Sequence, residues 1–128
     1  MREILFKAKR KDNSEWVEGY YQKRFDLDGS EQHFIFWSKS YTVWEYVEID
    51  FDTLCQYTGL TDKNGEKIWE NDITYIRSSG LSGYGVIKYQ NGNLVLVDEK
   101  RKRTYSLYGE WKIRKDGNIF DNDLLEVE

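Results

Sequence analysis

The sequence predicts an all-β protein with at most short helical turns, and three observations lead to that prediction. Apolar and polar residues alternate with a period of two in most segments, which is the spacing of a strand with one drier face. Aromatic residues make up 16% of the chain and gather in short runs, as they do in strands. Turn-forming Gly, Asn and Asp separate these runs at short intervals, and the chain contains no Pro.

The first half of the chain contains four expected strands. They are expected at residues 4–9, 16–25, 33–37 and 41–49, with polar turns at 11–15 and 26–30. In the first strand, alternation puts Phe6 and Ala8 on one face and Lys7 on the other. In the fourth strand, the same argument puts Trp44 and Tyr46 on a partly exposed face.

The second half repeats this organisation with shorter strands. Strands are expected at 72–77, 84–89, 94–97, 104–108 and 111–114, with turns at 62–66, 90–93 and 116–118, a Gly/Ser loop at 78–83 and one closing helical turn capped at 121–123. We expect Trp111 and Ile113 to point inward in the last strand. Five short strands over about sixty residues suit a small barrel.

Charge and cysteine content favour a cytoplasmic protein without a membrane span. The net charge is −4, from 19 Lys and Arg against 23 Asp and Glu. The single cysteine, Cys55, excludes an internal disulfide, so nothing indicates an oxidising compartment. No apolar run approaches the roughly 18 residues of a spanning helix, and the first residues lack the apolar stretch of a signal peptide.

The segment from Gln56 to Ile73, QYTGLTDKNGEKIWENDI, is the most specific in the chain. It resembles the hallmark of the YopX family, small proteins of bacteriophages and prophages, and supporting matches lie at 2–8 and 117–125. The family pattern usually has Gly where this chain has Asn71, and Asn tolerates the same positive φ. The resemblance implies an all-β fold with a C-terminal SH3-like barrel, a phage-related context in the host cytoplasm and no established biochemical activity.

These observations together predict two small β lobes. Residues 1–61 form an N-terminal lobe with its joining segment, and residues 62–128 form the SH3-like barrel. In the joining segment, Gly59 and Gly65 supply unusual backbone angles, while Asp62 and Asp72 can accept hydrogen bonds from nearby backbone amides. We therefore interpret this segment as an architectural joint in preference to a binding site.

No catalytic, cofactor or metal site is expected, and no small-molecule substrate. A zinc site needs several Cys or His ligands, and the chain offers only Cys55 and His33. Counting from Asp62, the calcium-loop pattern requires Gly and Glu at positions that hold Lys67 and Ile73. A Cys55–His33 dyad would need the fold to join the two residues, so an enzyme is the third alternative.

Basic clusters beside aromatic residues support nucleic-acid binding as an alternative function. Small barrels bind nucleic acid through basic loops and stacking aromatics, although this chain is acidic overall, with a pI near 5.1. Solvated hairpin tips are the competing explanation of these clusters. The candidate contacts are Lys7, Lys9, Lys11, Lys100, Arg101, Lys102, Arg103, Tyr105, Lys112 and Arg114.

The favoured interpretation is a non-catalytic interaction module that binds another protein or assembles with itself into a homo-oligomer. Interfaces are enriched in aromatic residues, and contiguous apolar patches rarely stay bare. The competing explanation is that these aromatics form the core of a small β domain. The candidate interface residues are Trp16, Tyr20, Trp37, Trp44 and Tyr46.

Overall fold

A computed structural model describes residues 4–78, 81–107 and 113–122, and these residues form an all-β protein. The expected fold class is therefore confirmed. The chain divides into two compact units, Met1–Tyr57 and Thr58–Glu128, whereas the sequence analysis placed the boundary after residue 61. Nowhere in the described ranges is there a helix long and apolar enough to cross a membrane.

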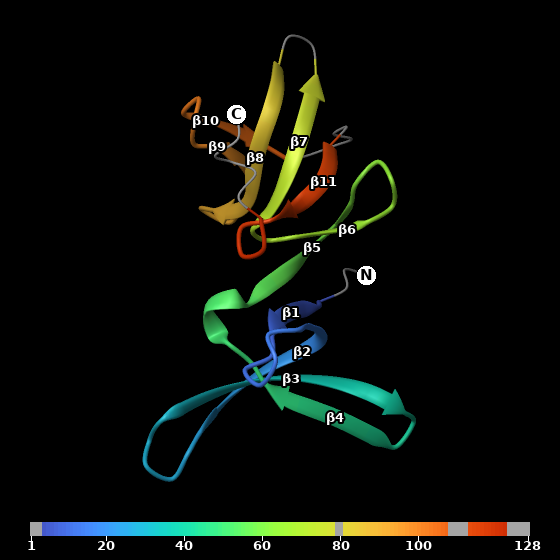
Figure 1. Cartoon of the computed structure of the whole chain (residues 1–128), viewed down its shortest axis with the longest axis vertical. Coiled ribbons are helices and arrows are strands. Elements are labelled where there is room, and N and C mark those ends of the chain that lie inside the picture. The colour runs from blue at the N-terminus through green and yellow to red at the C-terminus, as the bar shows by residue number, and fades with distance from the viewer. Residues whose placement is uncertain (1–3, 79–80, 108–112, 123–128) are drawn as a thin grey trace. The chain divides into compact units, whose positions relative to one another are not determined.

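The first unit is built on an antiparallel sheet with the strand order β4-β3-β2-β1-β5 (Figure 1). Its strands are β1 Phe6–Lys9, β2 Trp16–Phe25, β3 Glu31–Ser40 and β4 Val43–Glu48, followed by the 3-10 turn η1 Phe51–Thr53. The strand β5, Cys55–Thr61, begins in this unit and continues past its last residue, Tyr57. Neighbouring strands in the order from β1 to β4 are also consecutive in sequence, so this part is a meander of hairpins. The strand β4 therefore lies at an edge of the sheet.

One face of this sheet carries the core of the first unit. Ala8, Ile35 and Ile49 are fully or almost fully buried there, and larger side chains such as Tyr21 and Trp37 pack against them. Gly19 lets β2 and β3 approach closely, since a Cβ at this position would lie 2.1 Å from the carbonyl oxygen of Phe36. The opposite face of the same strands is consequently left for other contacts.

The second unit contains a five-stranded antiparallel sheet with the order β10-β9-β8-β7-β11. Its strands are β7 Asp72–Ser78, β8 Leu81–Gln90, β9 Asn93–Asp98, β10 Arg103–Ser106 and β11 Ile113–Asn118; β6 Lys67–Trp69 pairs instead with the strand β5. Within the described residues, the two edge strands β10 and β11 do not pair with each other, so the sheet is open. The SH3-like barrel is therefore not confirmed.

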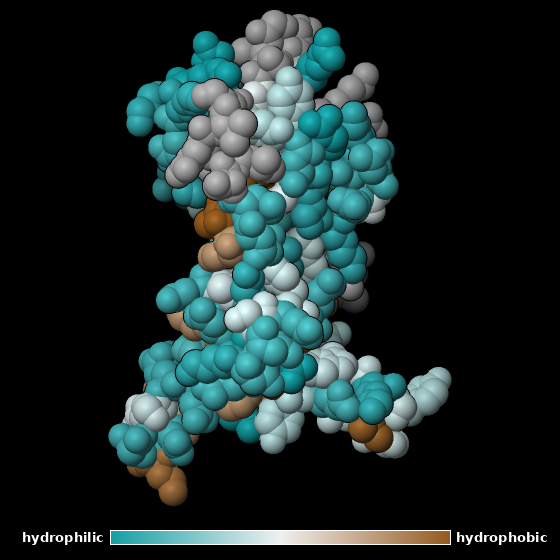
Figure 2. Space-filling model, viewed as in Figure 1, coloured by the Kyte–Doolittle hydropathy of each residue, from teal (hydrophilic) through white to brown (hydrophobic). Residues whose placement is uncertain are grey.

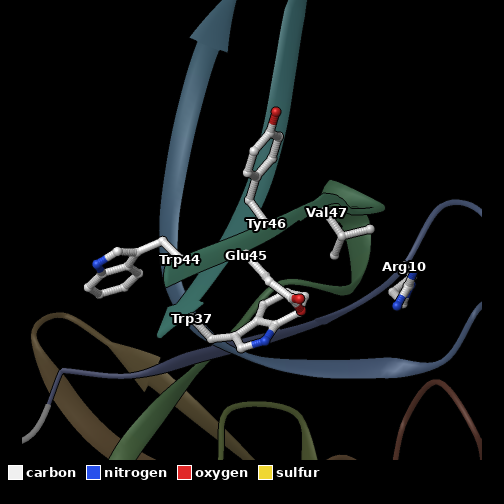
Figure 3. A pocket seen from close by; sticks show the side chains of 6 residues that line it. All are labelled: Arg10, Trp37, Trp44, Glu45, Tyr46 and Val47. Atoms are coloured by element: carbon white, nitrogen blue, oxygen red, sulfur yellow. The ribbon is translucent and has the colours of Figure 1, made fainter. Parts of the chain in front are cut away.

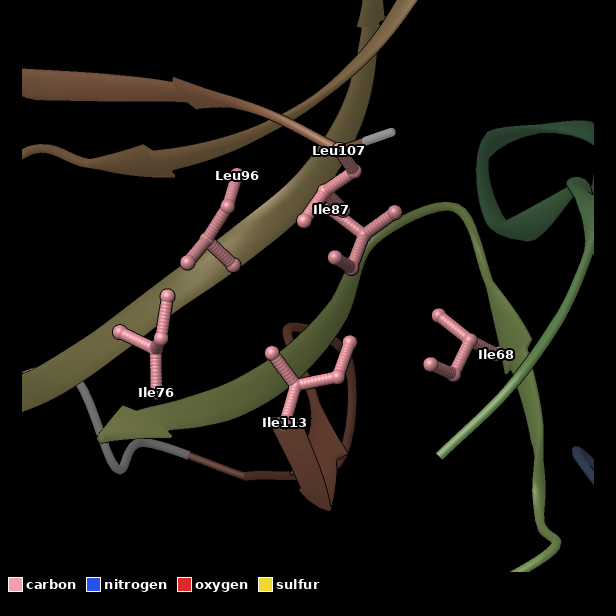
Figure 4. Close-up of a cluster of buried hydrophobic side chains, with 6 residues drawn as sticks. All are labelled: Ile68, Ile76, Ile87, Leu96, Leu107 and Ile113. Atoms are coloured by element: carbon pink, nitrogen blue, oxygen red, sulfur yellow. The ribbon is translucent and has the colours of Figure 1, made fainter. Parts of the chain in front are cut away.

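The core of the second unit is aliphatic. Its buried side chains come from six separate segments and meet on one side of the sheet (Figure 4); they are Ile68, Ile76, Ile87, Leu96, Leu107 and Ile113. Burial of Ile113 confirms its predicted inward direction, while Trp111 lies outside the described residues.

The two aspartates expected to accept hydrogen bonds from backbone amides do so. Asp62 accepts hydrogen bonds from three backbone amides, and Asp72 accepts one from the amide of Trp69.

Three expectations about local structure were wrong. The segment around Gly59 is a strand, β5, and residues 67–69 form another, β6. The expected turn at 116–118 belongs to β11, where a bulge between Lys115 and Gly117 takes up the extra residue. The Gly/Ser loop is shorter than expected, because β7 and β8 extend to Ser78 and Leu81. Of the expected helical turn at 121–123, the last residue lies outside the described ranges.

Candidate interaction face

The strands β2, β3 and β4 present a group of aromatic side chains on the face opposite the core. Pairing places Tyr20 beside Phe36, Phe36 beside Tyr46 and Ser38 beside Trp44. Alternation within each strand then puts every second residue on the same side. We call this group the aromatic face; it consists of Tyr20, Arg24, Phe34, Phe36, Trp44 and Tyr46.

Much of the aromatic face is open to solvent. Tyr20, Trp44 and Tyr46 are 56%, 54% and 57% exposed, while Phe34 and Phe36 are half-buried between them. The rings of Tyr20 and Trp44 lie 6.0 Å apart, and those of Phe36 and Tyr46 lie 5.2 Å apart in a stacked arrangement. These spacings are those of interacting aromatic pairs.

A cation lies over the middle of the aromatic face. The guanidinium carbon of Arg24 is 5.4 Å from the ring centre of Phe34, 5.2 Å from that of Phe36 and 5.7 Å from that of Tyr46. Planar guanidinium groups stack well on aromatic rings and are weakly hydrated. The face therefore combines Tyr, Trp and Arg, the residue types that contribute most to binding in protein interfaces.

A shallow depression of about 350 Å³ accompanies the edge strand β4 (Figure 3). Its walls contain both aromatic residues of β4 and residues from the core side of the sheet: Arg10, Trp37, Trp44, Glu45, Tyr46 and Val47. Figure 2 shows that the surface of the molecule in that view is mostly hydrophilic, with hydrophobic residues in small separate groups. The edge of this sheet therefore combines a surface depression with exposed aromatic side chains.

Four of the five predicted interface residues lie on the same side of the first sheet. Tyr20, Trp44 and Tyr46 belong to the aromatic face, and Trp16 lies on that side at the start of β2, beneath the ammonium groups of Lys7 and Lys9 from β1. Trp37 lies on the opposite side and packs against the core. Sequence reasoning missed Arg24, Phe34 and Phe36, although their alternation with core residues could have revealed them.

The predicted nucleic-acid contacts of the first unit are largely engaged within the protein. Lys7 is 7% exposed, and its Nζ lies 4.6 Å from the ring centre of Trp16. The Nζ of Lys9 lies 5.5 Å from the same ring, and Lys11 forms an ion pair of 3.3 Å with Glu48. Of the three lysines, Lys11 is the most exposed.

The predicted contacts of the second unit fall at two places within it. Lys100, Arg101 and Lys102 form the turn between β9 and β10, where Arg101 pairs with the buried Asp98 at 3.0 Å. Arg103 begins β10, while Tyr105 packs against the core and so faces inward. Arg114 lies in β11, and Lys112 falls outside the described residues.

Arg114 is held by a carboxylate. Its Nε and one terminal nitrogen donate to the two oxygens of Asp116 at 2.7 and 2.9 Å, and its guanidinium carbon lies 5.1 Å from the ring centre of Tyr75. These bonds hold the pKa of Asp116 below its ordinary value, against the opposing effect of burial. Burial, followed by the charge of Asp116, raises the pKa of Tyr84. The cluster is a satisfied ion pair on a sheet.

Cys55 and His33, the two residues of the candidate catalytic dyad, each contact neighbouring residues of the first unit. Cys55 is 1% exposed, and its thiol donates to the carbonyl oxygen of Thr53 at 3.3 Å. The Nδ1 atom of His33 lies 2.6 Å from the hydroxyl of Tyr21, and its ring stacks on Phe51 at 4.1 Å. Across the described ranges, His, Cys, Asp and Glu do not come together in a group of three or more able to hold a metal ion.

Comparison with protein families gives one finding about the whole chain. Residues 5–126 match the family model described as YopX, YopX protein. This range contains the QYTGLTDKNGEKIWENDI segment and all the described strands. A search of curated proteins returns no match to the chain.

Proposed function

The chain belongs to the YopX family, and on that premise we propose that it is a non-catalytic interaction protein of phage or prophage biology. It binds a protein chain, either a partner or a second copy of itself, through the aromatic face of the first unit. It acts in the cytoplasm of the bacterial host. The observation that carries the proposal is that exposed Tyr20, Trp44 and Tyr46 share one side of the sheet, where the Arg24 guanidinium also stacks over Tyr46.

The aromatic face is less favourable in water than it would be against a partner. Burying apolar area on binding contributes about 25 cal/mol per Å², and aromatic rings offer a large area with few rotatable bonds. Phe34 and Phe36 already hold the neighbouring rings and Arg24 in place, so little ordering remains to be done when a partner binds. A preorganised aromatic surface of this kind favours protein recognition.

Non-catalytic binding agrees with the way the reactive side chains are used. The Cys55 thiol and the His33 imidazole are engaged in contacts within the first unit, as described above. A thiol acts as a nucleophile as its thiolate, in an accessible and electropositive place. The buried position of Cys55 beside a carbonyl oxygen has neither property.

The test compares two variants in capture and in solution. Tyr20→Ser/Tyr46→Ser removes two exposed rings from the aromatic face, and Tyr41→Ser removes a fully exposed ring outside it. We expect the wild type and Tyr41→Ser to capture the same partner from prophage-carrying bacteria, or to self-associate by light scattering, and the double variant to lose at least about 90% of that binding. Equal binding by all three proteins contradicts the proposal.

Nucleic-acid binding is the second candidate, and one observation favours it. Cations and rings alternate on one side of the first sheet, with Lys9 at Trp16 and Arg24 at Phe34, and such surfaces bind single strands by stacking. Against it, residues 1–57 contain 8 Lys and Arg and 11 Asp and Glu, so this unit repels phosphate overall.

Filter binding across a salt series separates the two candidates. If the face binds single-stranded DNA or RNA, retention at low ionic strength falls as salt rises, and Arg24→Gln reduces the slope by about one phosphate contact. We expect no salt-dependent retention. If retention falls as salt rises and is weaker for Arg24→Gln, nucleic-acid binding becomes the better-supported function.

A further inference from the structure

We infer that a second copy of this chain pairs with β4 in an antiparallel, two-fold symmetric arrangement, and that this pairing joins two sheets edge to edge. The inference rests on the proposed function and specifies its self-assembling form. Three features favour this pairing: the direction of the backbone groups of β4, the composition of the sheet edges and the self-complementary sequence of β4.

The backbone groups of Trp44 and Tyr46 point away from the sheet. The amide of Ile49 donates to the carbonyl of His33 at 2.9 Å, directly after the pair of Phe34 with Glu48. Antiparallel pairs alternate between bonded and non-bonded, so the residues of β4 that bond to β3 are the odd-numbered ones. Trp44 and Tyr46 consequently direct their N–H and C=O groups toward the edge, where the described residues place no further strand.

This edge lacks the devices that discourage pairing. Sheet edges are commonly protected by Lys or Arg, by Pro or by a bulge. In the second unit, the edge strand β10 follows the basic turn 100–102, and the edge strand β11 has a bulge between Lys115 and Gly117. The strand β4, with the sequence VWEYVE, contains no Lys, Arg or Pro, and the register shift in its pairing with β3 falls on β3, between Ser38 and Ser40. From Trp44 to Glu48 it is a regular edge strand, and its aromatic side chains are exposed.

The position of Lys11 selects one register. Its amide donates to the carbonyl of Glu48 at 3.1 Å, so this carbonyl is already used and the chain occupies that end of the edge. An antiparallel copy that bonds only to Trp44 and Tyr46 is centred on Glu45. In this register Trp44 faces Tyr46 of the second copy, and Tyr46 faces its Trp44.

The side chains agree with this register on both sides of the sheet. On the aromatic side, the cross-strand Trp–Tyr pairs continue the aromatic face from one copy to the other. On the other side, Val43 faces Val47 of the second copy at the depression beside Arg10 and Trp37. The Glu45 carboxylates of the two copies face each other. Within each copy, the Nζ of Lys39 lies 3.2 Å from a carboxylate oxygen of Glu45, and this ion pair offsets the repulsion.

Disulfide trapping tests the register directly. Glu45→Cys places two thiols in a non-bonded antiparallel pair, with Cα atoms roughly 4.5 Å apart, inside the range of a disulfide. In the matched control Val43→Cys, the two thiols are four residues out of register, about 13 Å apart. The native Cys55 is buried and does not compete. We expect Glu45→Cys to form a covalent dimer at least about ten-fold faster than Val43→Cys.

Light scattering then measures the mass of the wild-type protein in solution. We expect a dimer at the protein concentrations at which Glu45→Cys is trapped. Equal trapping of the two cysteine variants, or dimers that Glu45→Cys does not trap, overturns the inference. A monomer that captures a partner through the aromatic face overturns the inference and leaves the proposed function intact. A monomer that captures nothing overturns both.

Discussion

Replacing Asp62 with Ala should destabilise the second unit by about 3 kcal/mol. The Asp62 carboxylate is 6% exposed and accepts three backbone hydrogen bonds. One oxygen accepts from the amides of Asn64 and Glu66 at 2.8 and 2.9 Å, and the other accepts from the amide of Lys115 at 3.0 Å. A single carboxylate therefore holds a turn closed and ties it to β11.

The magnitude follows from what happens to each donor. A hydrogen bond to a charged group contributes ~1.5–3 kcal/mol. In Asp62→Ala, the amides of Asn64 and Glu66 lie in an exposed turn and regain water, so their loss is partial. The half-buried Lys115 amide loses its partner with less access to solvent. Asp62→Asn keeps one acceptor oxygen, so we expect about half the loss, ~1.5 kcal/mol.

Urea unfolding followed by circular dichroism and tryptophan fluorescence measures these changes. The matched control is Glu66→Gln, which removes a negative charge from an exposed side chain of the same turn and should leave the midpoint within error. If Asp62→Ala and Glu66→Gln shift the midpoint equally, the loss is one of charge, and the reasoning from hydrogen bonds is refuted.

The dependence on pH has a definite sign. Burial raises the pKa of Asp62, but the three backbone hydrogen bonds outweigh it and the net pKa lies below 3.8. A carboxyl group with a lowered folded-state pKa contributes stability that is complete above its ordinary pKa. That contribution is lost as pH falls through the folded-state pKa. The difference between wild type and Asp62→Ala should thus be constant near neutral pH and shrink below about pH 4.

Three further predictions concern single positions in the fold. Asn71 has φ of 68°, so Asn71→Ala should cost about 1 kcal/mol more than Asn71→Gly in urea unfolding; equal losses would contradict the backbone argument. A Cβ at Gly85 would lie 2.7 Å from Leu96, so Gly85→Ala should cost ~1–3 kcal/mol, and Leu96→Val should recover part of it; simple additivity would exclude this contact. Cys55 should react with a thiol reagent only after unfolding, and rapid labelling of the native protein would refute its buried position.

The strands that sequence reasoning predicted best are those with a regular alternation. Residues 16–25 form β2 as expected, and Trp44 and Tyr46 lie on the exposed side of β4. A period of two is a property of neighbouring residues, so it can be read without knowing what the strand pairs with. Positive φ at Asn71 and backbone capping by Asp62 are equally local, and both are confirmed.

The strands that were missed exist because of distant partners. Residues 55–61 contain Gly59, with φ of 84°, and resemble a loop in sequence. They are extended because β1 and β6 pair with them, and the Thr58 hydroxyl donates to the carbonyl of Ile68. The bulge in β11 likewise turns a sequence typical of a turn into part of a strand. No local pattern contains this information, since tertiary pairing overrides propensity.

The sequence by itself determined the fold class, the family and which residues of each strand share a side. The tertiary structure decided that Arg24 lies over Phe34, Phe36 and Tyr46, that Trp37 joins the core and that β4 is an edge strand. The physical reason is that alternation is dictated by the geometry of one strand. Strand order and register depend on hydrogen bonds and packing between residues far apart in the chain, which only the folded protein brings together.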